Sequence, residues 1–214
     1  MNGELKFDAD LVKWHQNKIR GGIAEAACRA HFEALGYAVE STGIEHIAPQ
    51  YSKLHGHPAG SYIGDVKKIQ KLPDFLISRV HGSTSVNDVK NMTGKADAVF
   101  VEAKYRTDVV LEDFTQEILG AYKHLLQNGI HFIVYLVCKR HKKKPSDKAF
   151  STGSFVFLNF FNPNVSRTNG DTGWHEPGEP IFSKLALYQG IHESEDFNRA
   201  YSEIVQPVLS ETLA

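Results

Sequence analysis

The sequence contains only two cysteines, Cys28 and Cys138, among its 214 residues, and neither belongs to a Cys-x-x-Cys pair. This scarcity argues against a disulfide framework and against a zinc ribbon. No apolar run approaches the roughly 20 residues of a membrane-spanning helix. The first ten residues carry charges where a secretory signal would need an apolar segment. We therefore expect a reduced, soluble, cytoplasmic protein.

The sequence also lacks an excess of charge of either sign. Lys and Arg together number 24 and Asp and Glu 25, which gives a formal net charge of −1. A uniformly basic nucleic-acid-binding protein is thereby excluded, although a local basic groove is not. Gly-x-Ser-x-Gly elbows and glycine-rich phosphate loops following a strand are absent too, so a hydrolase triad and a nucleotide triphosphatase have no support.

The length and a hydrophobic content of 42% predict a single globular domain spanning 1–214, with its core at about 20–160. Apolar periodicity and turn residues predict helices and strands along the chain. The expected helices cover 23–35, 111–128 and about 193–213, the last kinked or ended by Pro207, and the expected strands cover 37–41, 72–80, 96–106, 130–138 and 154–161. Three strands, a crossover helix and a buried strand describe a mixed α/β sheet flanked by helices.

The strand over 96–106 contains two charged residues, Glu102 and Lys104, in an apolar run. Side chains alternate along a strand, so both point to one face, where burial is costly unless the site uses them. Asp74 enters the preceding strand after Pro73 and is expected to converge with Glu102. Two adjacent carboxylates favour a hard cation such as Mg²⁺. Helical spacing places Glu25 on the core-facing side of the first helix, as a further ligand.

Pro73-Asp74 followed by Glu102-Ala103-Lys104 resembles the signature of the PD-(D/E)xK nuclease superfamily. The resemblance covers about residues 20–140 and includes the order of the elements. It implies a restriction-endonuclease-like αβββαβ core and hydrolysis of phosphodiester bonds, mostly in DNA and occasionally in RNA. The cofactor implied is Mg²⁺, with Mn²⁺ as an alternative. The resemblance further implies that Asp74 and Glu102 bind metal while Lys104 orients or activates the nucleophilic water.

Two residues of the following helix extend the resemblance. Gln116 is similar in placement to a glutamine near the site in resolvase-like and RecB-like members. Tyr122 resembles their later tyrosine, although its spacing from Gln116 departs from the usual pattern. Nucleases that cut both strands often pair, so a homodimer is a further expectation.

Basic segments supply candidate nucleic-acid contacts, because phosphate binding needs local positive charge. They are Lys67, Lys68 and Lys71 before Asp74, and Lys139, Arg140, Lys142, Lys143 and Lys144 in a segment expected to be a charged loop. The histidines at 46, 55 and 57 are expected at the surface. Trp174 either stacks on a base or closes over its own domain.

Other interpretations of the same residues stay open. Glu102 and Lys104 form a structural salt bridge in one of them, Asp74 is only a turn acid after proline in another, and Glu25 and Gln116 lie on solvated helix faces in a third. The alternative functions are a nucleic-acid-binding or scaffolding protein that keeps the fold without cleavage, and a protein-interaction domain.

Overall fold

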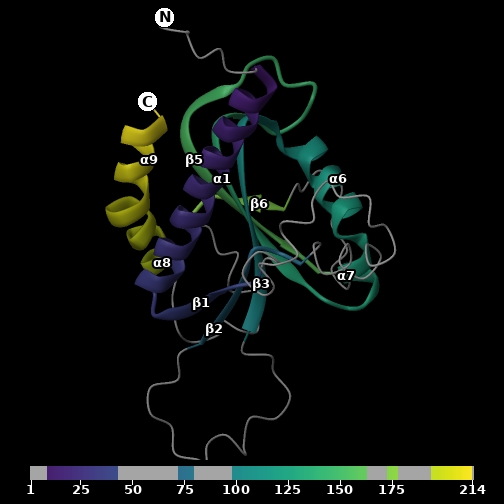
Figure 1. Cartoon of the computed structure of the whole chain (residues 1–214), viewed down its shortest axis with the longest axis vertical. Helices are drawn as coiled ribbons and strands as arrows, with labels where there is room; N and C mark the ends of the chain where they lie inside the picture. The colour runs from purple at the N-terminus through teal and green to yellow at the C-terminus, as the bar shows by residue number, and fades with distance from the viewer. Residues whose placement is uncertain (1–8, 43–71, 80–97, 163–172, 178–193, 214) are drawn as a thin grey trace, which may run out of the picture.

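The computed structural model describes residues 9–42, 72–79, 98–162, 173–177 and 194–213, and every structural statement concerns these residues. Within them, helices flank a six-stranded mixed sheet (Figure 1), which confirms the expected α/β class. The elements follow in the order α1 (Ala9–Ala34), β1 (Tyr37–Ser41), β2 (Phe75–Arg79), β3 (Ala98–Val110), α6 (Leu111–Ala121), α7 (Lys123–Gln127), β4 (Phe132–Lys142), β5 (Ser151–Phe161), β6 (Trp174–His175), α8 (Ser194–Ala200), the π-helical turn η3 (Tyr201–Val205) and α9 (Gln206–Leu213).

The strands lie in the sheet in the same order as in the sequence, β1 to β6. Every neighbouring pair is antiparallel except β3 and β4, which run parallel. Parallel neighbours need a crossover connection, and α6 and α7 supply it. The crossover places the centre of the sheet between helices on both faces.

Two hydrophobic layers cover the two faces of the sheet. One packs α1 and the C-terminal helices against the sheet through residues such as Cys28, Phe32 and Leu209. The other packs α6 and α7 against the opposite face through Phe114 and Ile118. Figure 1 shows α1 with α8 and α9 on one side of the sheet and α6 with α7 on the other. Because β4 lies between both layers, residues 132–138 are all fully buried, as its continuous apolar run predicts.

Glycines end the helices where the sequence predicts. Gly36 follows α1 with φ of 80°, and Gly129 follows α7 with φ of 75°. This left-handed backbone is open to glycine and strained for other residues, so both positions serve as helix stops. The expected start of the first helix at Ile23 is wrong, because α1 begins at Ala9 and continues through Gly21 and Gly22.

The expected helix over 111–128 is divided into α6 and α7 at Tyr122. The backbone there leaves helical dihedrals, with φ of −107° and ψ of 17°. The break lies where the Tyr122 side chain is buried between the helix and the sheet.

The segment Lys139–Lys142, expected to be a loop, is part of β4, which ends only at Lys142. His141 explains this correction, because its ring is buried between Phe155 and Phe157, with centroids 4.4 and 4.7 Å away. A buried residue every second position holds a strand in place even when its neighbours are charged.

The C-terminal helix continues past Pro207 instead of ending there. The π-helical turn η3 gives way to α9 at Gln206, so Pro207 occupies the first turn of the new helix, where a missing N–H costs little. His31 of α1 holds the start of this segment. Its ring nitrogens contact the Tyr135 hydroxyl at 3.0 Å and the Phe197 carbonyl at 2.8 Å.

Trp174 closes over its own domain, which is one of the two roles expected for it. Its ring is buried and stacks on Phe114, and its indole nitrogen donates to the Leu111 carbonyl and the Thr115 hydroxyl. The short strand β6 that carries it was not predicted. No helix in the described part of the chain is long and apolar enough to cross a membrane.

Candidate functional site

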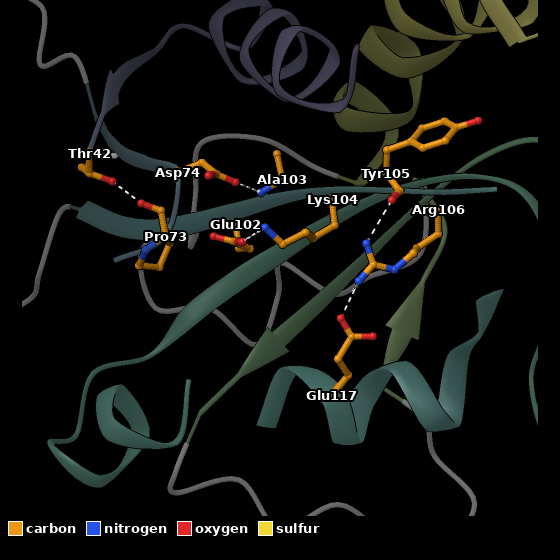
Figure 2. Close-up of polar contacts among 9 residues, drawn as sticks. All are labelled: Thr42, Pro73, Asp74, Glu102, Ala103, Lys104, Tyr105, Arg106 and Glu117. Atoms are coloured by element: carbon orange, nitrogen blue, oxygen red, sulfur yellow. Dashed lines mark hydrogen bonds and ion pairs between the residues drawn. The ribbon is translucent and has the colours of Figure 1, made fainter. Parts of the chain in front are cut away.

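The turn into β2 places Asp74 against the centre of β3. Phe75 pairs with Val101 in antiparallel register, so Asp74 arrives beside the next residues of β3. One of its carboxylate oxygens, Oδ2, accepts a hydrogen bond of 2.9 Å from the Ala103 backbone N–H (Figure 2). Because backbone holds the carboxylate, its position is set by the pairing of the strands.

Thr42 at the end of β1 fixes the same turn from the other side. Its hydroxyl donates to the Pro73 carbonyl, and its backbone N–H donates to the Asp74 carbonyl at 2.9 Å (Figure 2). Sequence reasoning did not find Thr42, and its only signal was its position directly after the first expected strand.

Glu102 and Lys104 share one face of β3, as strand parity predicts, and their side chains form an ion pair. Only 1% of the Glu102 side chain is exposed, against 32% of the Lys104 side chain. Glu102 Oε1 meets the amine, whereas Oε2 is buried without a hydrogen-bond partner in the described part of the chain. An unpaired oxygen on a buried carboxylate is costly, so this atom is a candidate ligand to a bound group.

Both carboxylates act on the same two groups. Burial alone would lower the pKa of Lys104, but the charges of Glu102 and Asp74 outweigh it and raise that pKa above its usual value. Burial raises the pKa of the Tyr122 hydroxyl, and the Glu102 charge, a side-chain hydrogen bond to Glu102 and the Asp74 charge raise it further. Tyr122 therefore lies close to Glu102 and Asp74. The sequence suggested this tyrosine only through the family resemblance, because its spacing from Gln116 departs from the usual pattern.

Glu25 approaches the same region from α1. Burial raises the pKa of the Cys28 thiol, and the charges of Asp74, Glu25 and Glu102 raise it further. All three expected acids are thus close enough to one buried sulfur to influence it. The expectation that Glu25 faces the core is nevertheless wrong, because its side chain is exposed; a polar helix face here borders a cavity.

That cavity has a volume of about 420 Å³ and lies between α1 and β3. Its lining brings together residues from three separate segments: Arg20, Gly21 and Glu25 of α1, Asp74, and Lys104 of β3. The structure therefore gathers three of the expected site residues, Glu25, Asp74 and Lys104, around one opening, whereas Glu102 does not line it and is connected to it through its ion pair with Lys104.

Arg106 continues the charged face of β3, two residues beyond Lys104, and also lines the cavity. Its guanidinium forms an ion pair with Glu117 of α6 (Figure 2). It also lies 5.0 Å from the centroid of the Phe114 ring. Sequence reasoning missed Arg106, although the two-residue period through Glu102 and Lys104 leads directly to it.

Of the residues that the structure describes, the others expected at the site, Gln116 and the basic candidates for nucleic-acid binding, do not line this cavity. Gln116 lies on the exposed face of α6 and does not line the cavity. Lys139 and Arg140 lie on β4, and Arg140 is bound through two hydrogen bonds to Asp108 of β3. Residues Lys142, Lys143 and Lys144 continue away along β4 and the following turn, while Lys67, Lys68, Lys71 and the histidines at 46, 55 and 57 lie outside the described residues.

Among the described residues, no group of three or more His, Cys, Asp or Glu side chains is arranged to hold a metal ion. What the geometry offers is a pair, Asp74 and Glu102, with one buried oxygen unsatisfied. The chain matches no protein-family model, no curated protein and no solved structure.

Proposed function

We propose that the protein is a metal-dependent nuclease, most readily one that hydrolyses phosphodiester bonds in DNA. The observation that carries this proposal is the buried Glu102 carboxylate beside Asp74 and Lys104, whose Oε2 atom accepts no hydrogen bond within 3.5 Å from the described part of the chain. A stable fold gains nothing from such an oxygen, and a bound cation would satisfy it.

The donor set fits a hard divalent cation, because both candidate ligands are carboxylates. Asp74 and Glu102 would hold Mg²⁺ or Mn²⁺, which when bound would supply Lewis acidity to the phosphodiester. Glu25, across the cavity, is placed to assist from α1.

The chain's own residues then position the substrate. The Lys104 amine lies at the cavity wall and would place its charge on the scissile phosphate and the attacking water. Arg20 enters from α1 and would neutralise a second phosphate oxygen. The hydrogen bond from the Ala103 N–H would hold the Asp74 carboxylate at a constant position relative to Lys104 while the substrate binds.

The arrangement of the elements supports a restriction-endonuclease-like core. A helix, three antiparallel strands, a crossover helix and a parallel strand follow in the expected αβββαβ order. Asp74 and the Glu-x-Lys strand occupy the second and third strands of that order.

The test is incubation with plasmid, linear and branched DNA in Mg²⁺ or Mn²⁺. Cleavage should require the metal and should fall by at least 100-fold in Asp74→Ala and in Lys104→Ala, as expected for groups that stabilise the transition state. Asp113→Ala and Lys123→Ala remove the same charges at exposed positions of α6 and α7 and should leave cleavage unchanged.

Each other outcome assigns a different function. Salt-sensitive DNA binding without cleavage would establish the non-cleaving binding protein instead. The absence of both binding and cleavage would leave the interaction domain.

A further inference from the structure

A second cavity lies next to the first. It has a volume of about 580 Å³ and is bounded by the ends of β3, β4 and β5 and by α9. Thr107 of β3 lines both cavities, so the two openings adjoin at that residue. A ligand long enough to pass Thr107 would occupy both.

An irregularity in the sheet forms this cavity. Cys138 pairs with Phe155 and Arg140 pairs with Thr152, which leaves Lys139 alone on β4 opposite two residues, Gly153 and Ser154, on β5. Such a bulge disturbs the ladder and redirects side chains, and bulges recur beside functional sites. Here it opens the surface of the sheet at Lys139.

The C-terminal helix holds the bulge in place. The Ser154 hydroxyl donates to the Leu209 carbonyl of α9 at 3.4 Å, and the Tyr201 hydroxyl donates to the Ser154 carbonyl at 3.3 Å. Two contacts from a segment distant in sequence therefore connect this side of the cavity to the C-terminal helices.

The chemistry of the lining suits a phosphate group. Two basic residues, Lys139 and Arg140, contribute to it, and no acidic residue does. Four hydroxyl-bearing residues also line the cavity, Thr107, Thr152, Ser154 and Ser210, of which Ser154 already donates its hydroxyl to the Leu209 carbonyl. Lysine and arginine bind phosphate by charge, and hydroxyls add hydrogen bonds to its oxygens. Arg140 donates two hydrogen bonds to the Asp108 carboxylate, which offsets its charge, so Lys139 supplies most of the net positive charge of the lining.

We propose that the second cavity binds the sugar–phosphate backbone of the same nucleic-acid strand whose neighbouring phosphate lies at Asp74 and Lys104. This inference rests on the proposed nuclease function and deepens it, because it makes the substrate an extended polyanionic strand. It also separates the basic residues of segment 139–144 by role: Lys139 and Arg140 on β4 contact substrate, whereas Lys143 and Lys144 lie outside both cavities.

Binding of a fluorescein-labelled oligonucleotide in EDTA, followed by fluorescence anisotropy at several salt concentrations, tests the inference without cleavage. Lys139→Ala should weaken binding several-fold and make the slope of log affinity against log salt shallower by about one. Its matched control is Lys143→Ala, which removes the same charge from an exposed residue four positions later, and its affinity should change less than twofold.

A second pair of variants adds charge instead of removing it. Ser210→Glu places a carboxylate in the cavity and should weaken binding as Lys139→Ala does. Thr212→Glu adds the same charge to an exposed position of α9 that does not line the cavity, and should have little effect. Circular dichroism checks that each variant is folded.

The outcomes separate this inference from the proposed function. In one outcome the wild type cleaves DNA in a metal-dependent manner, while Lys139→Ala and Ser210→Glu bind the oligonucleotide like their controls. That result would overturn the proposed binding role of the second cavity and leave the nuclease proposal intact. Binding that depends on Lys139 and Ser210 in a protein that never cleaves would support the strand site and overturn the nuclease. In another outcome, inorganic phosphate at matched ionic strength displaces the oligonucleotide from the wild type but not from Lys139→Ala. That result would identify free phosphate as the occupant of the cavity and contradict the binding of a nucleic-acid strand there. A wild type that binds no oligonucleotide overturns both.

Discussion

Glu102 is the residue whose position is least explained by stability. It is almost completely buried, its partner Lys104 is one-third exposed, and its second oxygen has no hydrogen-bond partner in the described part of the chain. Replacing both members of a buried ion pair by well-packed hydrophobic residues is often neutral or stabilising, so a structural role alone gives little reason for a carboxylate here. A ligand-binding role does, because the cation would complete the missing interaction.

Glu102→Gln keeps the shape of the side chain and removes its charge. Because the substitution leaves the Lys104 amine without its ion-pair partner, we expect the melting temperature of the variant without metal to fall below that of the wild type. Added Mg²⁺ should raise the melting temperature of the wild type only, because saturating a site about 100-fold above its dissociation constant contributes about 2.7 kcal/mol to the native state. Differential scanning calorimetry across a Mg²⁺ series makes the measurement.

The exposed acid Glu112, in the first turn of α6, provides the control for this prediction. Glu112→Gln should keep the full response to Mg²⁺. An equal rise in melting temperature for Glu102→Gln would mean that the metal acts elsewhere on the protein.

At the level of single elements, α1 contains a feature that weakens it as a helix. Gly21 and Gly22 lie in its interior, although a Cβ built on either glycine would meet no atom within 4 Å. Packing therefore does not require glycine at either position. Gly21 lines the first cavity, opposite Lys104, whereas Gly22 is exposed.

Gly21→Ala and Gly22→Ala should each stabilise the protein by about 0.5–1 kcal/mol, because alanine favours the helix. Chemical denaturation measures this gain. Only Gly21→Ala should reduce oligonucleotide binding and cleavage, since its methyl group enters the space that the substrate backbone would occupy. Equal activity in the two variants would show that the helix backbone at Gly21 is not approached by substrate.

Much of this element structure follows from local sequence patterns. Alternation predicts the first strand without error, and Gly36 and Gly129 mark helix ends because their backbone requires φ > 0. The errors occur where distant contacts decide. The charged end of β4 is a strand because His141 is buried against β5, and local pattern cannot show which strand will lie beside it.

The candidate site shows the same division. Parity along one strand is local, so it places Glu102 and Lys104 together and leads on to Arg106. The position of Glu25 depends on how α1 lies over the sheet, and that packing puts an exposed glutamate at a cavity edge where helical spacing predicts a buried one. The contact of Thr42 with Pro73 depends on turn geometry, and the position of Lys139 opposite two residues of β5 depends on a bulge; periodicity encodes neither, although the sequence did mark Lys139 as a candidate contact by its charge.

At the scale of the whole molecule, His31 connects the two ends of the described chain. Its ring is fully buried, stacks on Phe197 with centroids 3.8 Å apart, and bonds to Tyr135 in the central strand. Burial lowers the pKa of His31 to about 4. The folded protein therefore keeps this ring neutral at pH values where the unfolded chain would protonate it.

The sign of the resulting pH dependence follows from proton binding. Between pH 6.5 and about 4 the unfolded chain binds the extra proton at His31, so the free energy of unfolding should fall as the pH decreases through this window, by about 3 kcal/mol in total. Urea denaturation of the wild type and of His31→Gln over this range tests it. The variant should be less stable at pH 7, and its pH dependence should be shallower by that amount; parallel curves would contradict the prediction.

The bond from His31 to Phe197 spans 166 residues of sequence. During synthesis at ~5–20 residues per second, the His31 ring therefore waits on the order of ten seconds before Phe197, which stacks on it, has been made. The strands that pack against the rest of α1 are made earlier, so His31 is left without its C-terminal partner throughout that interval. The packing around His31 is therefore completed only when the C-terminal segment, the last part of the described chain to be made, has left the ribosome.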